Sequence, residues 1–224
     1  MSRAVAVLAL GALSVVPLPA AASEIDVRLG GFFPRAQSNL FRDDSELYTV
    51  DRDDWQGLTG GAEFRFRVAP SLYVGLNLDG YGRTVHTQYR EFTRESGREI
   101  TQSLKLNIVP LGASLRWLPR DGRRDISPYV GAGVDAFFYK YEEFGDFIDF
   151  ESEDLDIIPD SFVSDGAAPG FHVLAGLRVP VSDDFSLVGE GRYQWARTDM
   201  GDDFRGNRLD LGGWSATFGV SLRF

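Results

Sequence analysis

The chain ends on a stretch with an unbroken two-residue period, Trp214-Ser215-Ala216-Thr217-Phe218-Gly219-Val220-Ser221-Leu222-Arg223-Phe224. Every even-numbered residue in it is apolar, and every residue between them is small or polar. Because successive side chains of a β-strand point to opposite faces of the sheet, this pattern predicts a strand with one apolar and one polar face.

Seven earlier segments follow the same alternation, which predicts eight strands in total. They cover residues 25–33, 61–68, 72–79, 101–118, 129–138, 171–179 and 185–195. In the fourth segment the apolar phase changes after Ile108. We expect a β-bulge at Val109-Pro110 to absorb this slip of one residue.

The connections between these segments alternate between long and short. Long polar connections cover residues 34–56, 88–99, 144–169 and 198–208, and short ones cover 69–71, 119–125 and 180–184. Outer-membrane barrels have short periplasmic turns and longer external loops. The sequence therefore predicts an all-β, eight-stranded antiparallel up-and-down transmembrane β-barrel with both termini in the periplasm. Whether residues 144–169 form an extra hairpin stays open.

The N-terminal segment resembles a secretory signal. Residues 1–22 hold an early positive charge at Arg3, an apolar run and the small residues Ala20-Ala21-Ala22. This order predicts a cleaved signal peptide over residues 1–22 and a mature barrel domain over residues 23–224 in a Gram-negative outer membrane.

Composition excludes several classes of partner and cofactor. The net charge of -10 argues against nucleic acid, which requires a basic face. Without cysteine the chain has no disulfide framework and no thiolate metal site, and no cofactor is expected.

The alternation by itself also fits a soluble periplasmic ligand-binding barrel with an apolar interior. Aromatic residues near the ends of the apolar face, such as Trp117 and Trp214, instead favour girdles at two membrane interfaces. A cation on the lipid face costs roughly 2 to 4 kcal/mol near the bilayer midplane. We therefore expect the charges on the strands to face the lumen.

The predicted lumen network contains both signs of charge. Its members are Asp26, Arg28, Glu63, Arg65, Arg67, Asp79, Lys105, Arg116, Asp135, Arg178, Glu190, Arg192 and Arg223. An apolar-Arg-apolar repeat ends each returning strand, which predicts one ring of Arg67, Arg116, Arg178 and Arg223 at the periplasmic mouth. An ion pair between Asp26 and Arg223 is expected to close the barrel.

Several motifs resemble those of the small outer-membrane barrel superfamily. They are the eight segments, the loop pattern, Pro128-Tyr129-Val130-Gly131-Ala132-Gly133, Glu190-Gly191-Arg192-Tyr193 and the terminal Phe224. That superfamily includes the membrane domain of outer-membrane protein A, the OmpW group and the opacity proteins. The resemblance implies that the barrel-assembly machinery reads the C-terminal strand ending at Phe224, and that the partners are outer-membrane lipid and lipopolysaccharide.

Function is less constrained than fold. Acidic loop residues Glu151, Glu153, Asp154 and Asp156 suggest a divalent-cation site, although no calcium-loop spacing is present. His86 and His172 have no serine next to them in the sequence, so no catalytic residue is assigned. The leading interpretation is a non-enzymatic structural or surface-interaction barrel with a side-chain-filled lumen. The alternatives are a narrow porin-like channel for small or apolar molecules and a lipid-modifying surface enzyme.

Overall fold

The strands of the protein form one sheet in a computed structural model that describes residues 23–94, 96–120, 125–149, 152, 156–204 and 206–224. The predicted signal peptide at residues 1–22 lies outside these residues. The strands are β1 (Ser23–Pro34), β2 (Gly57–Ala69), β3 (Leu72–Thr93), β4 (Glu99–Trp117), β5 (Ser127–Ile148), β6 (Ile157–Pro180), β7 (Phe185–Asp199), β8 (Arg208–Asp210) and β9 (Gly213–Arg223).

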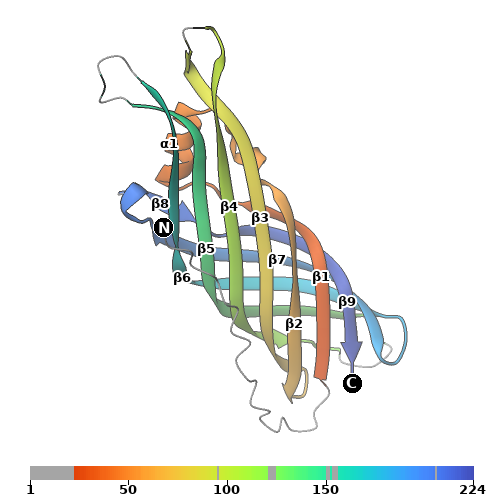
Figure 1. Ribbon diagram of the computed structural model, residues 1–224. Helices are drawn as coiled ribbons and strands as arrows, with labels where there is room; N and C mark the ends of the chain where they lie inside the picture. The colour runs from red at the N-terminus through yellow and green to blue at the C-terminus, as the bar shows by residue number, and fades with distance from the viewer. Residues whose placement is uncertain (1–22, 95, 121–124, 150–151, 153–155, 205) are drawn as a thin grey trace.

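Eight of these strands close into a ring. Each long strand pairs antiparallel with its neighbours in the chain, and β9 pairs with both β7 and β1. The short β8 pairs only with the end of β7. The predicted eight-stranded up-and-down barrel is therefore confirmed (Figure 1). Within the closed ring each strand is paired on both sides, which a sheet in hydrocarbon requires.

The two ends of the barrel differ. The turn end carries the short β2–β3, β4–β5 and β6–β7 connections, and the loop end carries the others. At the loop end the β3–β4 and β5–β6 hairpins rise above the rest (Figure 1). The predicted loops at residues 88–99 and 144–169 are largely strand, since β5 runs to Ile148 and β6 begins at Ile157. In its described residues the segment 144–169 lengthens two barrel strands and forms no separate hairpin. Its polar composition does not indicate these strands.

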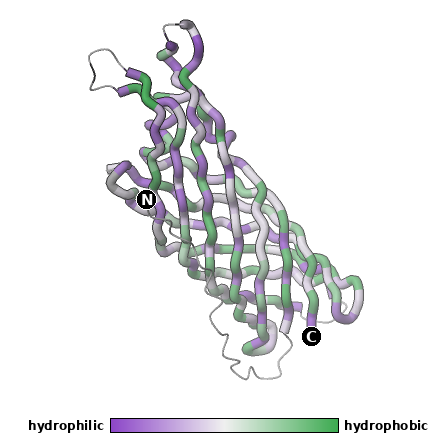
Figure 2. The backbone as a smooth tube through the Cα atoms, in the orientation of Figure 1, coloured by the Kyte–Doolittle hydropathy of each residue, from purple (hydrophilic) through white to green (hydrophobic). Residues whose placement is uncertain are grey.

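The apolar residues of the strands face outward along the middle of the barrel. Leu76 and Leu187 are about half exposed, Val134 is 66% exposed and Phe218 is 76% exposed. The alternation of hydrophobic and hydrophilic residues is visible along the strands in Figure 2. The apolar outside confirms the predicted transmembrane arrangement and is opposite to that of a soluble barrel.

The expected bulge at Val109-Pro110 is absent. The register of β4 against β3 is the same on both sides of this point, with Leu78 opposite Leu111 and Tyr81 opposite Ile108. The pairing of β4 with β5 runs through Val109 and Pro110 without a shift. The phase change in the sequence instead reflects a change in the lumen, which is polar toward the turn end and apolar toward the loop end.

This continuous register reverses the expected orientation of several side chains. Leu104, Leu106 and Ile108 point inward and are buried. Lys105 between them points outward, and its side chain is 41% exposed and 3.2 Å from Glu142 of β5. The prediction that Lys105 faces the lumen is therefore wrong, because the two-residue period holds through the whole of β4.

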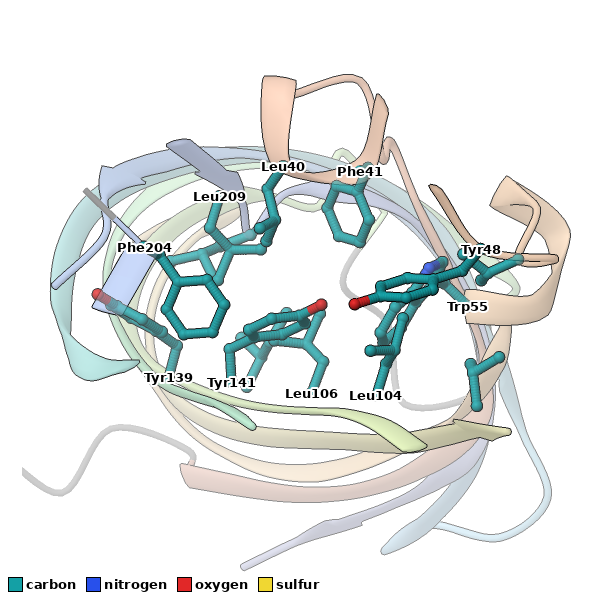
Figure 3. Close-up of a cluster of buried hydrophobic side chains, with 14 of the residues drawn as sticks. Leu40, Phe41, Tyr48, Trp55, Leu104, Leu106, Tyr139, Tyr141, Phe204 and Leu209 are labelled. Atoms are coloured by element: carbon teal, nitrogen blue, oxygen red, sulfur yellow. The ribbon is translucent and has the colours of Figure 1, made fainter. Parts of the chain in front are cut away.

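The first long connection covers the loop end of the lumen. It contains the helix α1 (Asn39–Leu47) and the short 3-10 helix η1 (Arg52–Trp55), while η2 (Asp202–Phe204) precedes β8. Figure 3 shows Leu40 and Phe41 pointing from α1 into the barrel mouth, toward Leu106 and Tyr141 of the wall. No helix among the described residues is long and apolar enough to cross a membrane.

Replacing Leu106 by alanine should destabilise the barrel by about 2 to 5 kcal/mol, because it removes buried side-chain atoms from a packed interior. The matched change at Leu111, which faces outward on the same strand, should cost much less because it opens no cavity inside the protein. Equilibrium unfolding in detergent micelles measures both. Equal losses at the two positions would contradict the register.

Candidate functional site

The middle of the lumen is filled by three arginines and three carboxylates. They come from five strands and are Arg28, Glu63, Asp79, Arg116, Glu190 and Arg192. They meet because the two-residue period directs alternate side chains of every strand toward the barrel axis. An eight-stranded barrel is just narrow enough for side chains to fill it.

Each carboxylate of this central group is shared between guanidinium groups. Arg28 Nη1 lies 2.8 Å from Glu190 Oε1 and 3.0 Å from Glu63 Oε2. Arg116 Nη1 lies 2.6 Å from Glu190 Oε2, and Arg116 also pairs with Glu63. Arg192 Nη1 donates to Asp79 Oδ2 at 2.8 Å. The result is a cross-linked network in which no pair is isolated.

A second ionic group lies closer to the turn end. Arg65 of β2 is 2.7 Å from Asp26 and 2.9 Å from Glu24. Glu24 also accepts hydrogen bonds from Arg178 at 2.7 Å and from Arg223 at 2.5 Å. Glu24 thus links β1 to three other strands, β2, β6 and β9.

The ion pair that closes the barrel is Glu24–Arg223, and the predicted Asp26–Arg223 pair is wrong. The β1–β9 register places Glu24 opposite Arg223 and Asp26 opposite Ser221. Sequence reasoning missed Glu24 although the signal was available. Glu24 has the same phase as Asp26 and Arg28, and it lies one pleat nearer the end of the strand.

The four arginines of the apolar-Arg-apolar repeat do not form one ring. Arg178 and Arg223 share Glu24 near the turn end, whereas Arg116 reaches into the central group. Arg67 Nε donates to the carbonyl of Ala69 at 3.3 Å. The repeat places these side chains on the inward face, but their guanidinium groups lie at different heights along the barrel axis.

A third polar group joins β3, β5 and β6. His172 Nδ1 lies 2.6 Å from Asp135 Oδ2, and Asn77 donates to the other oxygen of Asp135 at 3.4 Å. Gly133 leaves room for the imidazole, since a Cβ at this glycine would lie 2.6 Å from the ring of His172. The inward glycines thus accommodate large lumen side chains.

Tyr129 packs the central group against the wall. Its hydroxyl donates to Glu190 at 3.1 Å, and the guanidinium carbon of Arg116 lies 5.2 Å from its ring centroid. A Cβ at Gly176 would lie 2.3 Å from the Tyr129 ring.

Apart from Lys105, every charged residue that we predicted for the lumen occupies an inward-facing position in these strands.

The other candidate sites have less support. Glu151, Glu153 and Asp154 of the predicted cation site lie outside the described residues, and Asp156 is exposed just before β6. Among the residues with a described position, no group of three or more histidine and carboxylate side chains is arranged to hold a metal ion. His86 Nδ1 lies 2.9 Å from Ser103 Oγ on the outer face, a contact that sequence spacing did not reveal.

Replacing Glu190 by alanine should destabilise the barrel by about 3 to 5 kcal/mol, because it leaves the buried arginines around it without a shared counter-charge. Asp165→Ala removes the same charge from an exposed, outward position of β6 and serves as the control. Its expected cost is within about 0.5 kcal/mol. Unfolding in micelles gives both values, and a mild effect of Glu190→Ala would contradict a buried network.

Comparison with known proteins agrees with this architecture. The sequence model of the outer membrane protein beta-barrel domain matches residues 5–224. The crystal structure of the outer membrane protein OprG from Pseudomonas aeruginosa is similar at 13% identity, with a TM-score of 0.58 over 91% of this chain and 96% of OprG. That of Neisserial surface protein A has 13% identity and a TM-score of 0.49 over 91% of this chain and 97% of the other.

A comparison with curated proteins finds no significant match. The likeness to solved structures at such low identity concerns the fold alone. The sequence match spans the signal-like segment and the whole barrel, including all strands that build the charged lumen. The chain belongs to the outer membrane protein beta-barrel family, and it is a transmembrane β-barrel of the Gram-negative outer membrane.

Proposed function

We propose that this protein is a non-enzymatic barrel with a closed lumen that supports the envelope or mediates surface interactions through its loop end. In this proposal the loop end faces the cell exterior and both termini lie in the periplasm. One observation carries it: the lumen is filled along its length by two stacked layers of side chains. The charge network fills the turn half, and the apolar cluster under α1 fills the loop half.

The space between the two layers is small. A cavity of about 20 Å³ lies there, lined among others by Arg28 and Glu190 from the charged layer and by Phe32 and Phe137 from the apolar layer. Such a volume accommodates about one water molecule. The layers therefore meet almost directly, which supports a lumen closed to permeating molecules.

The outer surface supports contact with lipid and lipopolysaccharide. We call the outward-facing apolar residues around the middle of the barrel the apolar band. Lys105 and Lys140 are exposed on β4 and β5 on the loop side of this band, and both pair with Glu142. The Lys140 hydrogen bond helps to lower the pKa of the Glu142 carboxyl below its ordinary value. Mixed charges at this height suit the phosphate-bearing headgroups of an outer leaflet.

The C-terminal strand supports recognition by the barrel-assembly machinery. Phe224 follows the last strand in phase with the outward residues and is 65% exposed. An exposed terminal aromatic residue remains accessible to a partner that reads this strand before the barrel closes.

The contacts of the two histidines favour a non-enzymatic role. Serine-based hydrolysis needs a histidine that contacts both a serine and a carboxylate. Within the described part of the chain, His86 contacts Ser103, and His172 contacts Asp135, but neither set combines all three groups.

Bilayer recordings test the closed lumen. The purified mature barrel should show no steady single-channel conductance, because the charged layer fills the lumen independently of the apolar layer. Phe41→Ala, which disturbs only the apolar layer under α1, should also stay closed. Steady conductance from the folded wild-type protein would rule out the closed barrel and favour the narrow channel.

A further inference from the structure

Two buried carboxyl groups meet at the loop end, outside the charge network of the lumen. Asp44 lies on α1, and Glu143 lies on the part of β5 that extends beyond the apolar band. Each residue is only 6% exposed. Among the described residues, no arginine or lysine forms an ion pair with either of them.

A single hydroxyl group joins the two carboxyls. Tyr141 Oη lies 2.9 Å from Asp44 Oδ2 and 2.9 Å from Glu143 Oε1, and Tyr141 is fully buried. A phenol has one proton to donate, and its oxygen can also accept. Tyr141 therefore satisfies one ionised carboxylate as donor, and the second contact is a hydrogen bond only when that carboxyl carries a proton.

We propose that Asp44, Tyr141 and Glu143 form a proton-dependent latch that holds the α1 lid against the barrel wall. With one shared proton, all three groups are hydrogen-bonded and the buried pair carries a single negative charge. When that proton is lost, two carboxylates face each other without a cation, and one of them faces the lone pairs of the phenol. Both effects favour release of α1 into water, where the carboxylates are solvated.

The surroundings of the pair are apolar or neutral. Tyr48 and Tyr89 pack edge to face near it, and Trp55 and Phe204 contact the ring of Tyr141. Burial raises the pKa of the phenols of Tyr48 and Tyr141, so both stay neutral over the range in which carboxyls titrate.

The charged groups near the latch do not supply a positive charge that would neutralise the second carboxylate once its proton is lost. Asp43 on α1 adds a further negative charge. On β8, burial would raise the pKa of Asp210, but hydrogen bonds from Arg35 and Arg197 lower it below its ordinary value. Asp210 therefore anchors the start of the lid at any pH in which its partners are charged. On the other side of Asp44, Arg90 of β3 donates from Nε to the carbonyl of Ser45 at 2.8 Å, and this contact does not depend on the carboxyl proton.

The titration of the pair follows from its burial. Burial raises the pKa of Glu143 to about 7, and burial together with the charge of Glu143 raises the pKa of Asp44. A group whose pKa is raised in the docked state stabilises docking fully below its ordinary pKa and loses this effect as the pH rises through the docked value. Docking of α1 is thus strongest at acid pH and weakens toward neutrality.

The expected size of the effect is set by one proton. For a single proton, the ratio of docked to released lid should fall up to about tenfold per pH unit between the ordinary carboxyl range and about pH 7, and then level off. The charge network toward the turn end fills the lumen by itself. Release of α1 therefore changes the shape of the loop end without opening a path through the barrel.

The test measures the distance between α1 and the wall in the folded barrel. The chain has no cysteine, so spin labels attach only at an introduced pair, Ser45→Cys on α1 and Thr101→Cys on the exposed face of β4. Pulsed electron resonance should give a narrow distance distribution at acid pH, with a released component that grows several-fold by about pH 7. Asp44→Asn, Glu143→Gln and the double variant should each flatten this profile, because one neutral partner satisfies Tyr141 without a proton.

Glu46→Gln removes the same charge from an exposed position of the same helix and should keep the wild-type pH profile. The heat-dependent mobility shift on gels establishes that each variant is folded before it is measured. A wild-type profile that does not change with pH, or a double variant that keeps the wild-type profile, would overturn the latch. So would a lid that is released by a chelator at acid pH and restored by calcium, since the pair would then bind a metal ion.

Discussion

Hydrocarbon around the barrel is the constraint on which the rest of the structure depends. A charge on the outer face of a membrane-spanning strand costs several kcal/mol near the midplane, so charged side chains there turn inward. Inside an eight-stranded barrel they have no room to remain hydrated singly. They therefore share partners, and the central arginines and carboxylates are cross-linked through Glu63 and Glu190.

The same constraint relaxes at the loop end and allows a different interior. Above the apolar band the outer face no longer contacts hydrocarbon, so Lys105 and Lys140 point outward at little cost. The lumen at this height is free to become apolar, and α1 closes it with Leu40 and Phe41. The turn half of the barrel thus has a charged interior and an apolar outer face, whereas the loop half has an apolar interior and a polar outer face, as a soluble protein does.

Sequence reasoning succeeded wherever one rule held along a strand. The alternation at the C-terminus and in β1, β2 and β5 gave the strands, their number and the face that meets lipid. It failed at β4, because Leu104 and Leu106 face an apolar interior and look like a lipid face shifted by one residue. Lys105 was misplaced for the same reason.

Two contacts of the structure join residues that are far apart in the sequence, so no local sequence pattern predicts them. Glu24 was within reach of sequence reasoning, but the choice between Glu24 and Asp26 as the partner of Arg223 required the β1–β9 register. The meeting of Asp44 with Tyr141 joins residues 97 positions apart, through a helix inside a segment that reads as a polar loop. The path of that loop over the mouth is set by tertiary packing.

The most direct measurement places single spin labels at Leu76, Val134, Leu187 and Phe218 in lipid vesicles and compares collisions with oxygen and with a water-soluble nickel reagent. All four labels should collide with oxygen and be shielded from nickel, because hydrocarbon surrounds these outward positions. Labels that collide freely with nickel at these sites would show an aqueous surface and contradict the transmembrane barrel.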